Sequence, residues 1–419
     1  MNRRDFLKLT PALALPAIGG CGYLRIDPWH PLIRSPYITS IEQEQAIVSR
    51  GRLGWTDDGR IRVLYVRGTP YERGYQHGAL LRQEVADNLG FIYERALKKF
   101  HFKELFAEVY ERVRPFIPQE HVDEMHGLAH GARVPLELIH HLHILPEIGE
   151  WGGKREIKKV LKKMMSGELG TSCSNFGVNS SATKDGELYA VRILDWGLHR
   201  ISKLHEYPLI TVGVPEKGFA YANIGWVGFL GAISGMNEQG ITLGEMGNGD
   251  PPGETLFGTP MPFVLRDVMT YANNLEDVRK IITGHPGTCS FAFLMTDGKS
   301  GQSQIYVRER ERFVAFDPGQ DLRDGKEFFP AIQDTVYGGH YEDVMATLLK
   351  ENHGKLSPEL FMEEIIPKMA MKSNFQNVIY RPGRLQFWVN NAKDRDTSAV
   401  NQPYSLFDLG KALREFKSN

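Results

Sequence analysis

A cysteine and two charged residues stand where a β-hairpin would bring them together. Cys173 lies near the start of one apolar, strand-like run, and Arg192 and Asp195 lie near the end of the next. Asp185-Gly186, at the end of the turn 181–186 between the two runs, is a strong signal for a hairpin. The hairpin would place a thiol, a guanidinium group and a carboxylate close together. A nucleophile with a cation and a carboxylate beside it is the beginning of a catalytic site.

The stretch from Cys173 to Trp196 resembles the N-terminal-nucleophile (Ntn) hydrolases, in the branch of acyl-CoA:6-aminopenicillanic acid acyltransferase (peptidase family C45) and the choloylglycine hydrolases. Such proteins cut their own chain before the nucleophile. The resemblance implies a cut between Ser172 and Cys173, whose new α-amino group then acts as general base. It also implies that Arg192 favours the thiolate, while Asp195 holds the amino group and positions Arg192. The alternative is a buried structural cysteine, the usual fate of a lone thiol.

Two glycine-containing segments precede the cysteine and resemble the C45 pro-segment. In residues 68–78 the spacing of Gly74 and Gly78 leaves a helix face without side chains, against which another element can pack. Residues 124–134 resemble the small-residue helix that accompanies it. We therefore expect residues 62–172 to form a mostly helical pro-segment with one helix running from about residue 70 to 100. The basic run 151–171 is expected to be a linker that self-cleavage releases.

Beyond the hairpin, further strand-like runs and turns continue to resemble the same family. Residues 235–241 read as a turn between two strands, in which Asn237 serves the turn. Asn248, just downstream, is the candidate for stabilising the oxyanion. The family's Thr-Asn-His and Ser-Arg elements have no clear counterpart. His340 is the nearest equivalent, and His340 and Trp196 are weaker candidates for substrate binding.

The predicted fold class is α+β. The resemblance implies an αββα Ntn sandwich, with two stacked antiparallel sheets between helical layers, formed by residues 173–419. Hydrophobic residues make up 42% of the 419, and charged residues 24%, as in an ordinary globular protein with a large core. A net charge of −1 gives no indication of nucleic-acid binding.

Neither a metal nor an organic cofactor is expected. Three cysteines are too few for a disulfide framework or a zinc ribbon. Histidines are frequent between residues 121 and 143, and His126 and His130 are four residues apart. No His-Glu-x-x-His motif accompanies them, so they are interpreted as packing or surface residues.

The N-terminus reads as an export signal. Arg3-Arg4 resembles the twin-arginine motif, a short apolar stretch follows, and Ile18-Gly19-Gly20-Cys21 resembles a lipobox. We therefore exclude residues 1–21 from the fold and expect Cys21 to be lipidated. Residues 22–61 would be a tether and lead-in. The predicted location is the periplasmic side of a bacterial membrane, with the protein held there by its lipid anchor.

Together these features predict a self-cleaving amidohydrolase or acyltransferase with an N-terminal cysteine. Its substrate would be a small acylated amine, processed through a thioester acyl-enzyme, and the pro-segment would stay bound as a subunit. One alternative is a lipid-directed amidase or phospholipase-B-like esterase, favoured if apolar residues line the pocket. Another is an uncleaved, lipid-anchored binding protein of the same fold, because a fold alone does not determine function.

Overall fold

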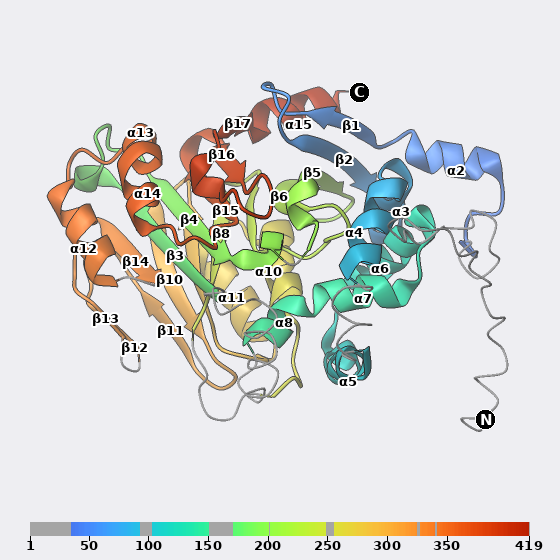
Figure 1. The fold of residues 1–419 in the computed structure, drawn as a ribbon, viewed down its shortest axis with the longest axis horizontal. Coiled ribbons are helices and arrows are strands. Elements are labelled where there is room, and N and C mark those ends of the chain that lie inside the picture. Colours follow the sequence, from blue (N-terminus) through green and yellow to red (C-terminus); the bar gives the residue numbers. More distant parts are fainter. Residues whose placement is uncertain are drawn as a thin grey trace.

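The computed structural model describes residues 35–92, 103–150, 171–200, 202–248, 255–324, 327–339 and 342–418. Two large β-sheets form the centre of this part of the chain (Figure 1). The nine-stranded sheet contains, in spatial order, β1 (Arg52–Trp55), β2 (Arg62–Gly68), β5 (Pro208–Pro215), β6 (Tyr221–Trp226), β7 (Ser234–Asn237), β8 (Ile241–Gly247), β9 (Phe291–Asp297), β10 (Gln302–Arg308) and β11 (Phe313–Phe316). The six-stranded sheet contains β14 (Thr335–Gly339), β3 (Thr171–Val178), β4 (Tyr189–Trp196), β15 (Gln376–Arg381), β16 (Gln386–Asn391) and β17 (Ser405–Asp408). A separate ribbon pairs β12 (Leu322–Asp324) with β13 (Glu327–Phe329).

Helices flank both sheets. Those before the hairpin are α2 (Ile41–Val48), α3 (Pro70–Leu80), α4 (Arg82–Ile92), α5 (Lys103–Val113), α6 (Gln119–Ala132), α7 (Leu136–His143) and α8 (Leu145–Glu150). Those after it are α10 (Met261–Tyr271), α11 (Leu275–Gly284), α12 (Glu342–Glu351), α13 (Pro358–Leu360), α14 (Ile366–Met369) and α15 (Leu409–Lys417). In Figure 1 the helices α3, α4, α6 and α7 lie in the right-hand part of the molecule, with β1 and β2 above α4, α6 and α7, and α12–α14 lie at the far left.

The two sheets pack face to face. A Cβ atom added at Gly177 of β3 would lie 2.9 Å from the Ser303 side chain of β10, and one at Gly244 of β8 would lie 3.2 Å from Asn175 Nδ2. The outer face of the six-stranded sheet meets the helical layer of α12–α14, where Phe176 packs edge-on against Phe361 at 5.3 Å. This contact belongs to one of two large apolar clusters. The other cluster packs the nine-stranded sheet against α10, α11 and the helices before the hairpin. The predicted αββα sandwich is confirmed.

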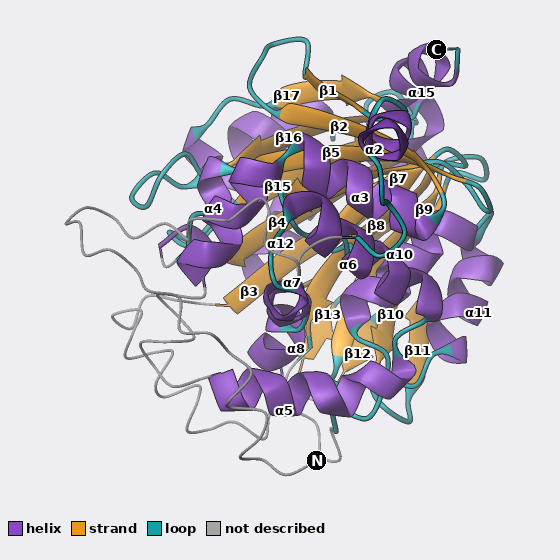
Figure 2. Cartoon of the chain, turned by 90° about the vertical axis from the view of Figure 1, so that its right-hand side faces the viewer, coloured by secondary structure: helices purple, strands orange, loops and turns teal. Residues whose placement is uncertain are grey.

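The segment before the predicted cut also contributes to the sheet. β2 pairs in parallel with β5, with Arg62 opposite Leu209, so one pair in the nine-stranded sheet departs from the predicted antiparallel arrangement. The described part of the predicted tether likewise contains regular elements, α2 and β1. In both Figure 1 and Figure 2, β1, β2, β17 and α15 come together at one edge of the molecule.

The glycine-based helix contact is present. α3 begins at Thr69, whose side chain forms a capping box with Glu72. A Cβ atom at Gly74 would lie 2.0 Å from the Glu124 carbonyl oxygen, and one at Gly78 would lie 2.4 Å from the Leu128 carbonyl oxygen on α6. The two helices therefore approach at backbone distance, which only glycine permits here.

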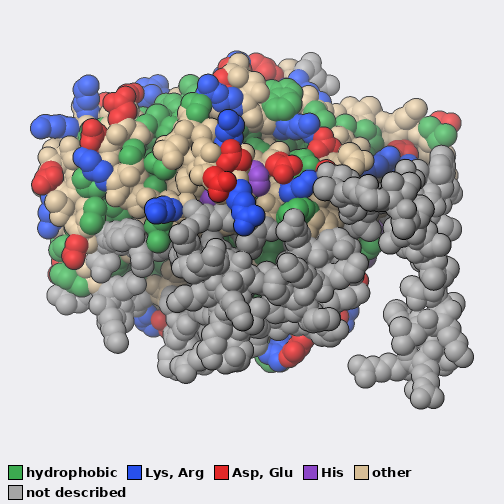
Figure 3. Space-filling model, viewed as in Figure 1, with side chains coloured by type: hydrophobic (Ala, Val, Ile, Leu, Met, Phe, Trp, Pro, Cys, Tyr) green, Lys and Arg blue, Asp and Glu red, His purple; other side chains and the backbone are tan. Residues whose placement is uncertain are grey.

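The predicted single helix from residue 70 to 100 is wrong in one respect, because it breaks at Leu81. There the backbone leaves the helical region (φ −124°, ψ 34°), and α4 starts at the next residue. Among the described helices, none has both the length and the apolar character needed to cross a bilayer. The face shown in Figure 3 carries basic and acidic side chains interspersed.

Candidate active site

The predicted hairpin forms, and its register determines which side chains share a face. β3 and β4 pair antiparallel, with Cys173 opposite Leu194, Asn175 opposite Arg192, and Ser172 opposite Asp195. Directly opposed residues point to the same side of a sheet, and alternate residues share a face. Cys173 and Arg192 therefore belong to one face, which is turned toward the nine-stranded sheet. Asp195 belongs to the other face.

Cys173 is partly exposed and lies at the junction of the two apolar clusters of the molecule. β14 runs along its other side, with Gly339 opposite Ser174. A Cβ atom at Gly339 would lie 2.2 Å from the Cys173 carbonyl oxygen, and the φ of 119° there also favours glycine. The backbone around the thiol is thus held on both sides by paired strands.

Arg192 is fully buried and forms an ion pair with Glu245 of β8, at 3.1 Å from Nη2 to Oε2. Asn175 fixes the backbone at this point, because its Nδ2 donates to the Gly244 carbonyl oxygen at 2.9 Å. Burial raises the pKa of Glu245, while the charge of Arg192 opposes that rise. The expectation that Asp195 positions Arg192 is therefore wrong: Glu245 is the carboxylate that contacts the guanidinium group.

Asp195 lies in a buried network on the opposite face. Its Oδ1 accepts hydrogen bonds from Asn374 Nδ2 at 3.0 Å and from the Met371 backbone N–H at 3.1 Å. Asn374 in turn exchanges hydrogen bonds with Asn377, each at 2.9 Å. The buried Oδ2 has no hydrogen-bond partner among the described residues. Burial raises the pKa of Asp195 to about 6, against the lowering effect of its hydrogen bonds.

Asn248 follows the last residue of β8. Its Nδ2 donates to Ser290 Oγ at 3.0 Å, and its backbone N–H donates to the Ser290 carbonyl oxygen at 3.4 Å. Its role at an oxyanion stays a prediction. Cys21, His340 and the linker 151–170 lie outside the described residues, and of Ser172 only the backbone pairing is described.

Trp196 lines an apolar pocket beside the head of the hairpin, where it pairs with Thr171. The other lining residues are Leu142, Leu145, Pro146, Leu204, Trp226, Phe229 and Ile233. Trp226 stacks on Phe375 at 4.8 Å, and its buried Nε1–H has no acceptor among the described residues. The walls thus combine helices from before the predicted cut with strands and loops from after it.

A family model described as acyl-coenzyme A:6-aminopenicillanic acid acyl-transferase matches residues 183–320. The predicted family resemblance is confirmed over this range. The match contains Arg192, Asp195, Glu245 and Asn248, and it begins after Cys173. It relates the chain to acyl-transferring enzymes.

Two proteins of Dictyostelium discoideum are similar over a longer range. The chain is 25% identical to Protein dcd1B over 322 residues, covering 70% of this chain and 60% of that protein. It is 24% identical to Protein dcd1A over 312 residues, covering 67% and 66%. The chain thus spans about two thirds or less of the length of these relatives. Among solved structures, a Caenorhabditis elegans N-acylethanolamine-hydrolyzing acid amidase ortholog aligns with a TM-score of 0.38 and 13% identity, over 50% of this chain and 93% of that one.

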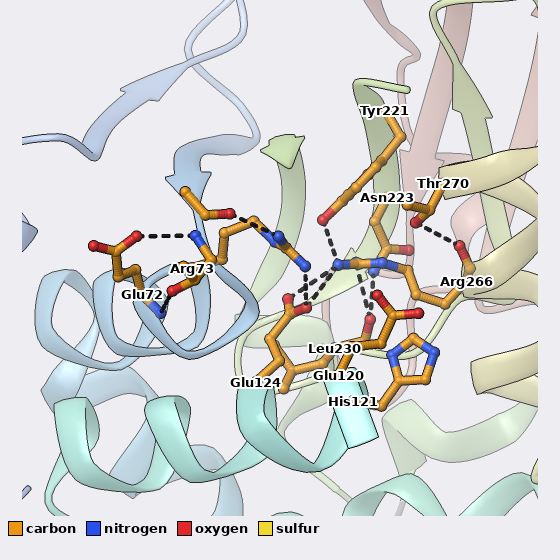
Figure 4. Close-up of polar contacts among 12 residues, drawn as sticks. Glu72, Arg73, Glu120, His121, Glu124, Tyr221, Asn223, Leu230, Arg266 and Thr270 are labelled. Carbon is orange, nitrogen blue, oxygen red and sulfur yellow. Dashed lines mark hydrogen bonds and ion pairs between the residues drawn. The ribbon is translucent and has the colours of Figure 1, made fainter. Parts of the chain in front are cut away.

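A buried ionic network holds the helices α3 and α6, which precede the hairpin, against β6, the loop after it and α10 (Figure 4). Glu124 of α6 accepts from Arg73 of α3 at 2.9 Å and from Arg266 of α10 at 3.0 and 3.1 Å. Arg266 also donates to the Tyr221 hydroxyl and to the Leu230 carbonyl oxygen. Burial by itself raises the pKa of Glu124, but the charges of Arg266 and Arg73 outweigh it and lower the pKa to about 2.

Three more buried side chains form hydrogen bonds with the backbone of the loop after β6, which is part of the apolar pocket. His77 Nε2 accepts the Gly228 N–H at 3.0 Å, and His143 Nε2 accepts the Leu230 N–H at 2.7 Å. Asn88 Nδ2 donates to the Val227 carbonyl oxygen at 2.8 Å. Desolvation lowers the pKa of His77 to about 3 and that of His143 to about 4, so both rings are neutral acceptors at pH 7.

Sequence reasoning missed Glu245 and Asn374. A usable signal exists for Glu245, because it is the one charged residue in the otherwise uncharged strand β8, where an unpaired charge would be costly. Asn374 precedes Gln376 and Asn377 in a stretch whose side chains are all buried. Buried amides require partners, so such a run also indicates a built polar site.

Proposed function

We propose that the protein is a self-cleaving, N-terminal-cysteine amidohydrolase or acyltransferase that acts on a small acylated amine. The observation that carries the proposal is the arrangement at the head of the hairpin. A partly exposed thiol shares a face with a buried guanidinium group. The buried Asp195, one oxygen of which has no hydrogen-bond partner among the described residues, lies opposite Ser172. A cation near a thiol lowers its pKa and so favours the thiolate.

Activation is a single cut. The Cys173 thiolate attacks the carbonyl carbon of Ser172, and the Ser172–Cys173 C–N bond breaks as the nitrogen gains a proton. Water then hydrolyses the resulting thioester and leaves a carboxylate on Ser172 and an amine on Cys173. This amine lies at the end of a strand within the plane of the sheet, so Asp195 Oδ2 can accept its N–H from the other face. A terminal amine titrates at about 7.7–8.0, near the optimum for a general base at neutral pH.

Turnover then proceeds through a thioester. The amine of Cys173 takes the thiol proton, and the sulfur attacks the acyl carbon of the substrate. The protonated amine returns its proton to the leaving amine. Water or a second amine releases the acyl group. Asn248 and backbone N–H groups are the proposed oxyanion donors, each contributing on the order of 3 kcal/mol.

Glu245 and Asn374 position the groups that react. Glu245 pairs with Nη2 of Arg192 and fixes the direction of its guanidinium group, whose Nε and Nη1 are buried without acceptors among the described residues. Asn374 orients Asp195 through Oδ1 and leaves Oδ2 for the amine. Neither role requires a cofactor.

We further propose that the segment before the cut stays bound as a subunit. β2 lies inside the nine-stranded sheet, paired with β5. Glu124 bridges Arg73 on one side of the cut and Arg266 on the other, and His77 and His143 hold the loop after β6. These contacts do not depend on the Ser172–Cys173 bond. The export signal and the lipid anchor at Cys21 complete the proposal, placing the enzyme on the periplasmic side of a membrane.

The apolar pocket favours a second candidate, a lipid-directed amidase or esterase. All eight residues that line the pocket are apolar or aromatic, and Trp196 brings it to the hairpin head. The apolar lining matches the chemistry of an acyl chain or an aryl-acyl group, and the Trp226 Nε1–H could donate to a polar atom of the substrate. The non-enzymatic alternative is a lipid-anchored binding protein that uses the same pocket and leaves Cys173 in an intact chain.

The test is to trap the acyl-enzyme. Purified protein is incubated with panels of short-chain, long-chain and aryl-acyl amides and of the matching esters, and intact mass is recorded at short times. The proposal expects a mass increase of one acyl group on the fragment that begins at Cys173, and none in Cys173→Ala. Release of product by Cys173→Ala at the wild-type rate would contradict it. Preference for long-chain esters would support the lipid-directed candidate instead.

A further inference from the structure

Two histidines and two carboxylates, none of them used in the proposed reaction, cluster between α6 and α10. Glu120 and His121 belong to the first turn of α6 (Figure 4), Asp267 belongs to α10, and His285 follows α11. His121 Nε2 lies 2.7 Å from Asp267 Oδ1, and His285 Nε2 lies 3.0 Å from Asp267 Oδ2. One ligand atom from each of Glu120, His121 and Asp267 lies within 4.8 Å of the other two.

We propose that Glu120, His121 and Asp267 form a structural site for a divalent transition-metal ion, zinc above all. Imidazole nitrogen and carboxylate oxygen are ligands that zinc takes in a tetrahedral arrangement. At metal–ligand distances of about 2.0–2.1 Å, two ligands of a tetrahedron are about 3.3 Å apart. The His121–Asp267 pair, 2.7 Å apart, must therefore separate by about 0.6 Å, and the widest pair must close by at most about 1.5 Å. The side chain of Glu120 can supply the closing movement, because the residue is only partly buried.

His285 offers a fourth ligand or a partner behind the first three. Its Nδ1 contacts Thr259 Oγ1 at 3.2 Å, which fixes the ring while Nε2 points at Asp267. A histidine held in this way either joins the ion directly or orients a ligating carboxylate, and both arrangements are common around zinc. Water fills the remaining position in the second case.

The burial and charge of the cluster suit a cation. His121 and Asp267 are 5% and 6% exposed, whereas the His285 side chain is 21% exposed and provides a route of entry. Nearby, Arg73 and Arg266 are paired with Glu124. Around the site, the three carboxylates of Glu120, Glu124 and Asp267 outnumber the two guanidinium groups. This excess of carboxylates favours a divalent cation.

A metal here would join the two sides of the predicted cut. Glu120 and His121 precede Cys173 in the chain, and Asp267 follows it. The ion would therefore link α6 to α10 beside the Arg73–Glu124–Arg266 network and help retain the helical segment. The intact chain contains all of these residues, so the proposal stands or fails separately from self-cleavage.

The experiment is a titration of chelator-treated, full-length protein with Zn²⁺ by calorimetry and with Co²⁺ by visible absorption. We compare Glu120→Gln and Asp267→Asn with His126→Ala, a histidine of the same helix outside the cluster. The expected result is one equivalent bound by wild type and by His126→Ala, with affinity reduced at least about tenfold in the other two variants. Thermal unfolding without metal checks that each variant is folded. If Asp267→Asn does not fold, the metal affinity of Glu120→Gln, a substitution at the rim of the site, tests the proposal.

Three results would overturn the proposal. The first is wild-type protein that shows no saturable binding of either ion. The second is Glu120→Gln that binds as tightly as wild type. A thiolate-to-cobalt charge-transfer band would place the ion on a cysteine and would equally contradict the assignment.

Discussion

Removing the charge of Glu124 should destabilise the protein strongly, because it would leave two buried guanidinium groups without their carboxylate. Glu124 is 4% exposed, and it is the shared partner of Arg73 and Arg266. The variant Glu124→Gln keeps the volume and one hydrogen-bond acceptor. Its effect therefore combines the loss of the charge with the loss of one hydrogen-bond acceptor that faces the guanidinium groups.

The magnitude follows from the pKa of Glu124. The pKa of this carboxyl group falls from 4.5 to about 2 in the folded protein. At about 1.36 kcal/mol per pKa unit, this corresponds to about 3 kcal/mol of stability at pH 7. The figure agrees with the roughly 3–5 kcal/mol that breaking a buried ion pair costs.

The effect has a definite dependence on pH. The folded pKa is depressed, so the contribution is fully present above pH 4.5 and is lost as pH falls toward 2. The difference between wild type and Glu124→Gln should shrink from about 3 kcal/mol at pH 7 to about 1 kcal/mol at pH 3. Other carboxylates titrate in both proteins, so only the difference is informative.

The assay is urea unfolding at several pH values between 3 and 7. Glu364→Gln is the control, since Glu364 pairs with Lys368 on the surface, with both side chains more than half exposed, and should change stability by less than about 1 kcal/mol. A Glu124→Gln variant within 1 kcal/mol of wild type at pH 7 would refute the reasoning. So would a difference that does not shrink on acidification.

Three further substitutions test other parts of the structure. Gly78→Ala should cost about 3 kcal/mol in urea unfolding, because its Cβ would lie 2.4 Å from backbone atoms of α6, whereas Gly284→Ala meets nothing within 4 Å and should be near neutral. The pKa of Asp195 is raised from 3.8 to about 6 in the folded protein, so its stabilising contribution is present below pH 3.8 and lost above pH 6. Between pH 3.5 and pH 7 the free energy of unfolding of wild type should therefore fall by about 3 kcal/mol relative to that of Asp195→Asn. Equal pH profiles would contradict this. Glu245→Gln leaves Arg192 buried without a charged partner, and it should lower the free energy of unfolding by about 3 kcal/mol and slow the appearance of cleaved chains on gels.

The hairpin and the glycine helix contact could be predicted because each rests on local signals, whereas the prediction of the layered fold rests on the family resemblance. Asp185-Gly186 marks the turn, and the spacing of Gly74 and Gly78 marks the contact face. The spacing of Arg192 and Asp195 also predicts that their side chains lie on opposite faces of the strand. Residues three apart on a strand point to opposite faces, so they could not both flank the thiol from the same side.

The partners of these residues could not be predicted from local patterns. Glu245 reaches Arg192 from the other sheet, 53 residues along the chain, and Asn374 reaches Asp195 across 179 residues. The parallel pairing of β2 with β5 likewise depends on the whole topology. Such contacts come from how the sheets stack, which no short stretch of sequence specifies.

The most direct test of the central claim is the intact mass and N-terminal sequence of purified protein, measured beside Cys173→Ala. The account predicts two fragments from wild type, one beginning at Cys173, that elute together on size exclusion, and a single uncut chain from the variant. Wild-type protein that remains one chain with Ser172 joined to Cys173 would contradict self-activation and favour the binding-protein alternative.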